Sequence, residues 1–297
     1  EIIVDLKKLK EITNMADTRI QSLNMLLDPT GKMFLAEEYG KVIENVQKLT
    51  ISGAMKNTEL SGDPHAGTVE AKRFANATPK NYGTARTAAK GDGVKGKTVT
   101  IPIDQDREIV EEVEQKDVSL LGVKGLIAKR TANHALRMAA ELDTKFFEVA
   151  GTDATEVDLT GITTIEEIAE KMIQQCETTK NEYVDGVPRL MMHMVLDPDY
   201  YGKIRTYLDK VTVPGVGAAD EEFYAFHGVK TYSCVHLPTD VKALVMVDGA
   251  IAQPVMSDPY NAEKIPLSNA YGIELFYHFG TKSVTPDLIF KNKKIGG

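Results

Sequence analysis

The clearest hydrophobic pattern in the chain runs through residues 123–149, where apolar side chains recur at steps of three and four. This spacing places them along one face of a helix, and a helix of that length extends for roughly 40 Å. Gly151 follows the last apolar position and predicts the end of the helix. The apolar positions are Leu126, Ile127, Ala132, Ala135, Leu136, Met138, Ala139, Leu142, Phe146 and Phe147.

Shorter patterns on both sides predict a mixture of helices and strands. Helical spacing recurs within the first fifty residues, where Asp28 to Gly31 predicts a turn, and again at 165–179, with Thr164 as N-cap, and at 198–208. Strands are predicted at residues 68–74, 97–103, 190–196, 229–235, 243–247, 271–279 and 284–290. A loop rich in Pro and Gly separates two of these elements at 211–220. The order of elements predicts an α+β fold.

Residues 53–96 differ from the rest because they contain almost no large aliphatic side chains. Their sizeable apolar residues are Val69, Phe74, Tyr82 and Val94, too few to bury a core of their own. The predicted strands at 68–74 and 97–103 would form a long two-stranded arm. A loop of this length inside a compact domain is unusual unless it packs on something outside that domain, and we expect such an external partner.

The net charge changes sign where the arm ends. Residues 65–97 contain seven Lys or Arg against two Asp or Glu, and residues 104–117 contain two against seven. Neighbouring segments of opposite charge suggest that the arm of one copy docks head-to-tail on the acidic segment of the next. The plainer alternative is a solvated basic loop beside a solvated acidic helix. The candidate contact residues are Lys72, Arg73, Lys80, Arg86, Lys90, Glu111, Glu112 and Glu114.

Composition narrows the class of protein. With 297 residues, of which 42% are hydrophobic, the chain can bury a core without disulfides or metals. Cys176 and Cys234 are isolated from one another, which favours folding in the cytosol and provides no zinc or redox motif. No apolar run approaches the roughly 20 residues that span a bilayer, so we expect no membrane association. The net charge of -8 argues against a tight non-specific grip on nucleic acid.

One formal motif occurs at the far end of the arm. Residues 91–98 match the phosphate-binding pattern in which Gly-Lys-Thr follows an earlier glycine after four residues. That site needs a buried strand before the loop and a helix after it; here the preceding residues are polar, and the following ones alternate as a strand that contains Pro102. A nucleotide-binding enzyme is therefore the least favoured alternative. The six histidines lack the spacing of a metal site, and we expect no catalytic residue, cofactor or metal.

In this order, the elements resemble those of the major capsid proteins of tailed bacteriophages. Members of that family have an N-terminal arm, an extended two-stranded loop, a long spine helix, a peripheral domain and an axial domain of mixed sheet and helices. The resemblance is carried by the helix at 125–143, by Phe226-His227-Gly228-Val229 with Leu237-Pro238 after it, and by the closing strands within 271–290. Encapsulins, which form protein compartments around a cargo enzyme, share the fold.

The resemblance implies a structural subunit, not an enzyme, that self-assembles into pentamers and hexamers of an icosahedral shell. It implies a virion protein, assembled in the host cytoplasm, that encloses DNA without sequence-specific binding and acts with a scaffold protein, a maturation protease and a portal. An encapsulin-like compartment is the first alternative. The implied domains are the N-terminal arm at 1–52, the extended loop at 53–105, the peripheral domain with the spine helix at 106–160 and 246–280, and the axial domain at 161–245 and 281–297.

Overall fold

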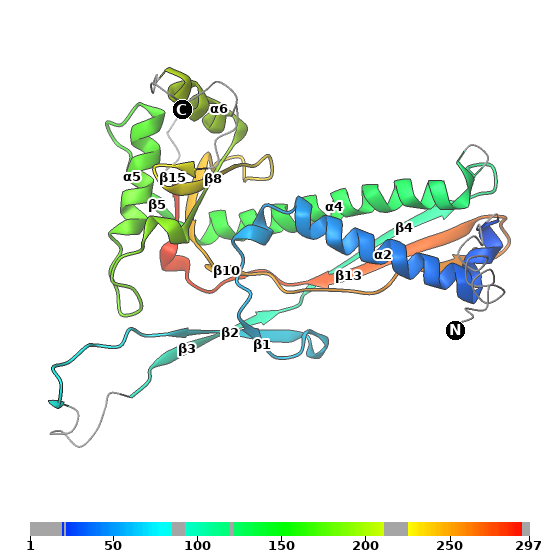
Figure 1. Ribbon diagram of the computed structural model, residues 1–297, viewed down its shortest axis with the longest axis horizontal. Helices are drawn as coiled ribbons and strands as arrows, with labels where there is room; N and C mark the ends of the chain where they lie inside the picture. The colour runs from blue at the N-terminus through cyan, green and yellow to red at the C-terminus, as the bar shows by residue number, and fades with distance from the viewer. Residues whose placement is uncertain (1–19, 21, 85–92, 119–120, 211–224, 293–297) are drawn as a thin grey trace, which may run out of the picture. The chain divides into compact units, whose positions relative to one another are not determined.

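The structure is a computed structural model that describes residues 20, 22–84, 93–118, 121–210 and 225–292. Its helices and strands confirm the predicted α+β class (Figure 1). The chain divides into two compact units. Unit 1 consists of Glu1–Lys48, Asp106–Met138 and Ser257–Tyr277, and unit 2 consists of Leu49–Gln105, Ala139–Met256 and His278–Gly297. Among the described residues, no helix combines the length and the hydropathy that a membrane span requires.

The long helix, α4, extends over Gly122–Asp153 and contributes to both units. The prediction of this helix is confirmed, but Gly151 does not end it. Gly151 lies in the last turn, where a Cβ atom would come within 3.1 Å of Pro238 and 3.2 Å of Val241. Glycine therefore allows the loop that carries these two side chains to pack closely against the helix.

Unit 1 begins with the 3-10 helix η1 (Leu23–Leu27) and the helix α2 (Pro29–Leu49). The turn predicted at residues 28–31 is wrong, because these residues enter the first turn of α2. Proline is favoured at the first helical position, since the N–H group of that position makes no hydrogen bond within the helix. Gly31 follows it, and a Cβ atom there would lie 2.1 Å from the Met25 carbonyl oxygen. The close approach of η1 to α2 thus requires a glycine.

The sheet of unit 1 is built around β13 (Tyr271–Phe279), which has the predicted bounds. It pairs with β11 (Val255–Ser257), β12 (Asn261–Lys264) and β4 (Gln105–Val113). β4 is the acidic segment, so the alternative of an acidic helix is wrong. Side chains of a strand alternate between its two faces, and those of β4 alternate between exposed and partly buried.

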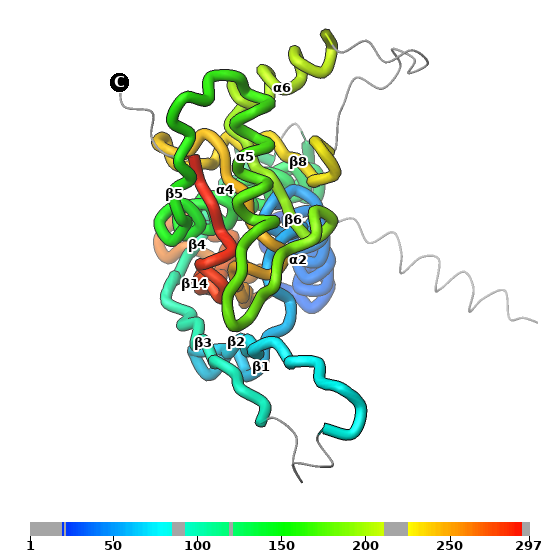
Figure 2. Tube along the Cα trace, turned by 90° about the vertical axis from the view of Figure 1, so that its left-hand side faces the viewer, coloured from blue at the N-terminus to red at the C-terminus, as the bar shows by residue number. Residues whose placement is uncertain are grey.

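Unit 2 contains a six-stranded sheet in the order β5-β15-β9-β6-β8-β7. Its strands are β5 (Thr155–Val157), β15 (Ile289–Asn292), β9 (Ala243–Val247), β6 (Met192–Leu196), β8 (Val229–Ser233) and β7 (Ala225–Phe226). Every residue of β6 and β9 is buried, as expected of strands covered on both faces. One face packs on α5 (Ile165–Glu177) and α6 (Pro198–Lys210), and the other packs on Phe146 and Phe147 of α4. Figure 2 shows α5 and α6 from the side of the sheet that they cover.

Three predicted strands of unit 2 are shorter than expected. β8 ends at Ser233 and not at residue 235. The residues before β6 form the 3-10 helix η4 (Arg189–Met191), so the strand does not start at Leu190. The last predicted strand is interrupted by the 3-10 helix η5 (Pro286–Leu288), since Pro286 has no N–H for a strand ladder. Before η5, β14 (Lys282–Ser283) pairs with β10 (Ile251–Ala252).

The predicted arm is confirmed as a ladder within unit 2. β2 (Thr68–Phe74) and β3 (Gly96–Pro102) pair antiparallel in a register that joins Thr68 to Pro102 and Phe74 to Gly96. The short strand β1 (Leu60–Ser61) adds to the other edge of β2. Two 3-10 helices, η2 (Ser52–Ala54) and η3 (Pro64–Ala66), precede the long strands.

Candidate functional site

The base of the arm packs on its own chain. One face of β2 and β3 buries four aliphatic side chains against Ala252 and Val284. These four are Val69, Ala71, Val99 and Ile101. The expectation that the arm has no apolar interior is therefore wrong for its base. The strand alternation directs small and β-branched residues inward there, although the composition of the whole segment is poor in them.

The outer part of the arm presents its apolar side chains to solvent. The relative exposures are 59% for Phe74, 91% for Tyr82 and 86% for Val94. Lys72, on β2, and Lys80 are also exposed, while Arg86 and Lys90 lie outside the described residues. Exposed aromatic and aliphatic groups beside lysines are typical of a surface that binds another macromolecule.

Arg73, another candidate contact residue of the arm, binds within its own unit. Its guanidinium donates two hydrogen bonds to the Asp287 carboxylate, at 2.5 and 2.7 Å, and lies 4.1 Å from the centre of the Tyr183 ring. Burial raises the pKa of Asp287, but the hydrogen bonds from Arg73 outweigh it and leave that pKa below its ordinary value. Arg73 therefore fixes the base of the arm, and we expect it to have no charge available for a partner.

The three acidic candidate residues, in β4 and just after it, have different surroundings. The carboxylate of Glu111 accepts hydrogen bonds from Arg130 of α4, so Glu111 stabilises unit 1 itself. Glu114 forms an ion pair with Lys116 at 2.7 Å. Glu112 is exposed and lies on the same face of β4 as Asp106, Glu108 and Val110, all of which are exposed. The name acidic face of β4 is used below for the exposed residues Glu108, Val110 and Glu112.

Behind β4, His134 belongs to a buried polar chain that the sequence did not reveal. Its Nδ1 lies 2.6 Å from the Tyr260 hydroxyl, and its Nε2 lies 3.1 Å from the Glu111 carboxylate. Burial lowers the pKa of His134, and the Glu111 carboxylate offsets only part of this effect. Burial also raises the pKa of Tyr260, so its hydroxyl stays protonated and donates a hydrogen bond to Nδ1 of a neutral imidazole.

Because the imidazole of His134 is buried and neutral, we expect the free energy of unfolding to depend on pH. Between pH 6.5 and the lower pKa of folded His134, the unfolded chain binds one more proton at this site than the folded chain does. Each such proton lowers the free energy of unfolding by about 1.4 kcal/mol per pH unit as pH falls. We expect the free energy of unfolding of His134→Gln to fall less steeply below pH 6.5 than that of the original protein, by up to this amount per pH unit. Urea unfolding at several pH values measures the difference. Equal slopes in the two proteins would contradict a neutral buried His134.

Two further histidines contact carboxylates in unit 2. His193 is buried in β6, in the interior of the sheet, and its Nε2 lies close to the Asp248 carboxylate. His227 Nδ1 lies 2.5 Å from Glu170, which is also bound by Arg189. The hydrogen bond from Arg189 is the main cause that lowers the pKa of Glu170 to about 2.

Neither the two cysteine thiols nor the phosphate-binding pattern lies in the surroundings that its chemistry requires. Burial raises the pKa of Cys176 to about 12 and that of Cys234 to about 11, so neither thiol is a ready nucleophile. Gly96, Lys97 and Thr98 of the phosphate-binding pattern lie in β3, a strand where that site needs a helix. In the described part of the chain, no group of three or more His, Cys, Asp or Glu could hold a metal ion.

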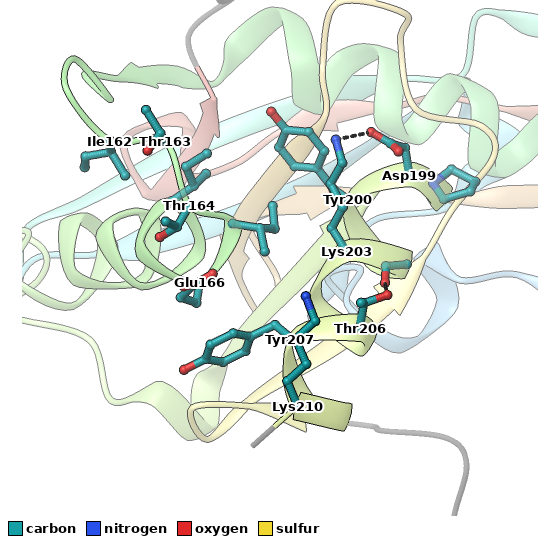
Figure 3. A pocket seen from close by; sticks show the side chains of 14 residues that line it. Ile162, Thr163, Thr164, Glu166, Asp199, Tyr200, Lys203, Thr206, Tyr207 and Lys210 are labelled. Carbon is teal, nitrogen blue, oxygen red and sulfur yellow. Dashed lines mark hydrogen bonds and ion pairs between the residues drawn. The ribbon is translucent and has the colours of Figure 1, made fainter. Parts of the chain in front are cut away.

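A groove of about 1090 Å³ lies between α6 and the N-terminal end of α5 (Figure 3). Ile162 and Ile165 line it on one side, and Tyr200 and Tyr207 line it on the other. At its rim, Lys203 forms an ion pair with Asp199 at 2.7 Å. The groove is open, and such a mixture of aromatic, aliphatic and charged groups is closer to a protein contact surface than to a closed substrate site.

By sequence, the chain matches no family model and no curated protein. By structure, it is similar to a chain of Mycobacterium phage Che8, with a TM-score of 0.60 and 16% identity over 78% of this chain and 86% of that one. The capsid of cyanophage P-SCSP1u gives a TM-score of 0.58 and 13% identity over 82% and 86% of the two chains. The virus-like particle from Pyrococcus furiosus gives a TM-score of 0.53 and 11% identity over 86% of this chain and 98% of that one.

At these identities the similarity lies in the fold and not in individual residues. It extends over most of each chain. The long helix, the two-stranded arm and the mixed sheets also occur in the order that the sequence predicted. The chain has the fold of tailed-phage capsid proteins, which the virus-like particle from Pyrococcus furiosus shares.

Proposed function

We propose that the chain is a structural subunit that self-assembles into a closed protein shell. The observation that carries this proposal is the similarity of most of the fold to the capsid of cyanophage P-SCSP1u and to a virus-like particle. A shared fold alone leaves function open. The exposed apolar and charged groups on the arm and on β4 add independent support, because they are surfaces without an evident role in a monomer.

In the proposed contact, the arm of one subunit lies on the acidic face of β4 of the next. Lys72 and Lys97 are exposed on the arm, and Glu108 and Glu112 are exposed on the acidic face. Because the two surfaces differ, the contact is head-to-tail, and repeated copies close into a ring when the rotation allows. The arm contributes Lys72, Lys80, Arg86 and Lys90, with Arg73 as its anchor, while Glu111 supports β4 and Glu114 lies at its end.

The shell that we propose is icosahedral, consists of pentamers and hexamers, and encloses a phage genome. The net charge of -8 fits a wall that encloses DNA without binding its sequence. Assembly in the host cytoplasm, with a scaffold protein, a maturation protease and a portal as partners, belongs to this proposal. The similarity to the virus-like particle from Pyrococcus furiosus supports an alternative function, in which the shell is a compartment that encloses cargo protein.

Purified full-length protein tests the proposal directly. We expect closed particles in negative-stain electron micrographs and a species of many subunits in analytical ultracentrifugation, because modest contacts sum over a closed lattice. Nuclease-protected DNA inside the particles would favour the genome, whereas co-purifying protein would favour the compartment. A compact monomer at every concentration, with or without molecular crowding agents, would refute shell formation.

A further inference from the structure

The groove between α5 and α6 has apolar walls that its own helices cover only in part. Four partly buried side chains pack on the core of unit 2 and also line the groove: Ile162, Ile165, Tyr200 and Tyr207. The volume of about 1090 Å³ exceeds the roughly 300–1,000 Å³ of pockets that bury a drug-sized ligand. A space of this size between apolar walls suits a short extended peptide with an apolar side chain.

The end of β15 lies beside both walls of this groove. Asn292, its last residue, pairs in parallel register with Val157 of β5, and Ile162 follows Val157 by five residues. The Asn292 side chain also accepts a hydrogen bond from the backbone N–H of Lys242, at 2.7 Å. The Lys242 ammonium donates a hydrogen bond to Asp197, the residue directly before α6, at 2.6 Å. A chain that continues past Asn292 therefore starts close to both walls.

Five residues, Lys-Lys-Ile-Gly-Gly, follow Asn292 in the sequence and lie outside the described residues. An extended chain advances about 3.3 Å per residue, so residues 293–297, here called the tail, can reach at least as far as residues 158–162 do. Ile295 is the one large apolar residue of the tail and lies in its middle. The two glycines after it allow the backbone to approach a wall closely.

The charges of the tail complement those of the segment beside it. Two lysines open the tail, whereas Asp158 and Glu166, in the segment that leads to the groove, are acidic. The same pairing of charges is present where the two strands end, since the Lys291 ammonium lies 3.8 Å from the Glu156 carboxylate. Opposite charges along two neighbouring segments favour one direction and register of approach.

We propose that the tail folds back onto its own subunit and inserts Ile295 between the two walls of the groove. The groove is then an intramolecular docking site for a segment of the same chain. A docked tail bridges α5 and α6 and stabilises the helical cover of the six-stranded sheet. This inference goes beyond the proposed shell and does not depend on it, because every contact belongs to one subunit.

Disulfide formation tests the position of the tail. The two native cysteines are buried, so oxidation by diamide should join the new thiols of Thr163→Cys and Gly296→Cys within one chain. Thr163 is exposed and lines the groove, and Gly296→Cys leaves Ile295 in place. Thr178→Cys with Gly296→Cys is the matched control, because Thr178 is also exposed but follows the opposite end of α5, roughly 20 Å away. We expect the first pair to form the bond at least tenfold faster, as loss of free thiols in a species of monomer mass.

Variants of the tail test the apolar anchor. Added to Thr163→Cys and Gly296→Cys, Ile295→Asp should slow the bond at least tenfold, and Ile295→Leu should leave its rate nearly unchanged. In the native-cysteine background, removal of residues 293–297 should lower the Tm of the free subunit by about 3 °C, because an apolar side chain and its groove lose their contact. Removal of Gly296 and Gly297 alone keeps the anchor and should change the Tm by less than about 1 °C.

Equal rates for the two cysteine pairs would refute docking in the groove. Disulfide-linked dimers in place of the intramolecular bond would mean that the tail binds another copy, and they would overturn the proposal as well. A rate that Ile295→Asp leaves unchanged would contradict an apolar anchor. None of these measurements requires particles, so their outcome is separate from that of the shell proposal.

Discussion

Exchange of both Glu108 and Glu112 for lysine is expected to abolish particle formation while the subunit stays folded. Both side chains are exposed on the acidic face of β4, so their replacement should change the Tm little. In the proposed contact they would face the lysines of the arm, and like charges across an interface cost several kcal/mol. Electron microscopy measures the particles, and circular dichroism measures the fold. Intact particles from this variant would contradict the electrostatic contact.

Three further variants act as controls for the charge reversal. Exchange of Lys72 and Lys97 for glutamate should also prevent assembly, and a protein that carries both pairs of exchanges should regain particles if the two surfaces meet. Glu111→Lys should behave differently, because it places a lysine against Arg130 and His134. We expect this variant to lose stability as a free subunit, which would confirm that Glu111 acts inside the fold.

Asp143→Ala is expected to lower the free energy of unfolding by about 3 kcal/mol. The Asp143 carboxylate is buried and accepts hydrogen bonds from the backbone N–H groups of Ile51, at 2.9 Å, and Ser52, at 3.0 Å. Alanine leaves a buried donor at Ser52 and a partly buried one at Ile51 without a partner, and each unsatisfied donor is costly. Urea unfolding of the free subunit measures the loss.

Asp143→Asn is the matched variant, because it keeps one oxygen that can accept and loses the charge. We expect its stability to lie between those of Asp143→Ala and the original protein. Thr144→Ala changes the neighbouring exposed position and should have a much smaller effect. If Asp143→Ala were as stable as the original protein, these hydrogen bonds would contribute nothing to the connection after α2.

Local hydrophobic periodicity predicted the regular elements well. Strands at 68–74, 243–247 and 271–279 have the predicted bounds, and the long helix differs mainly at its ends. Some of the errors arose where a single glycine or proline was interpreted without its surroundings, whereas the strand β4 was not predicted at all. Gly151 is required by the packing of a distant loop and not by the end of a helix, which local sequence does not show.

The role of each charged residue was harder to predict than its presence. Arg73 binds Asp287, 214 positions further along the chain, and only the folded structure brings them together. For β4, however, the sequence contained a pattern that could have distinguished the exposed from the paired glutamates. Residues two apart share a face of a strand, so the pattern places Glu112 with Glu108 and puts Glu111 on the other side.

The ion pair between Arg73 and Asp287 has a consequence for the kinetics and the accuracy of association. It holds the root of the arm in one direction in the free subunit, and the guanidinium contact with Tyr183 restricts it further. In the proposed contact, less conformational entropy would then be lost when a neighbour binds, as with any preorganised binding element. Each incoming subunit would also find the arm of its neighbour in nearly the same position, which would reduce the number of misplaced contacts during growth of the shell.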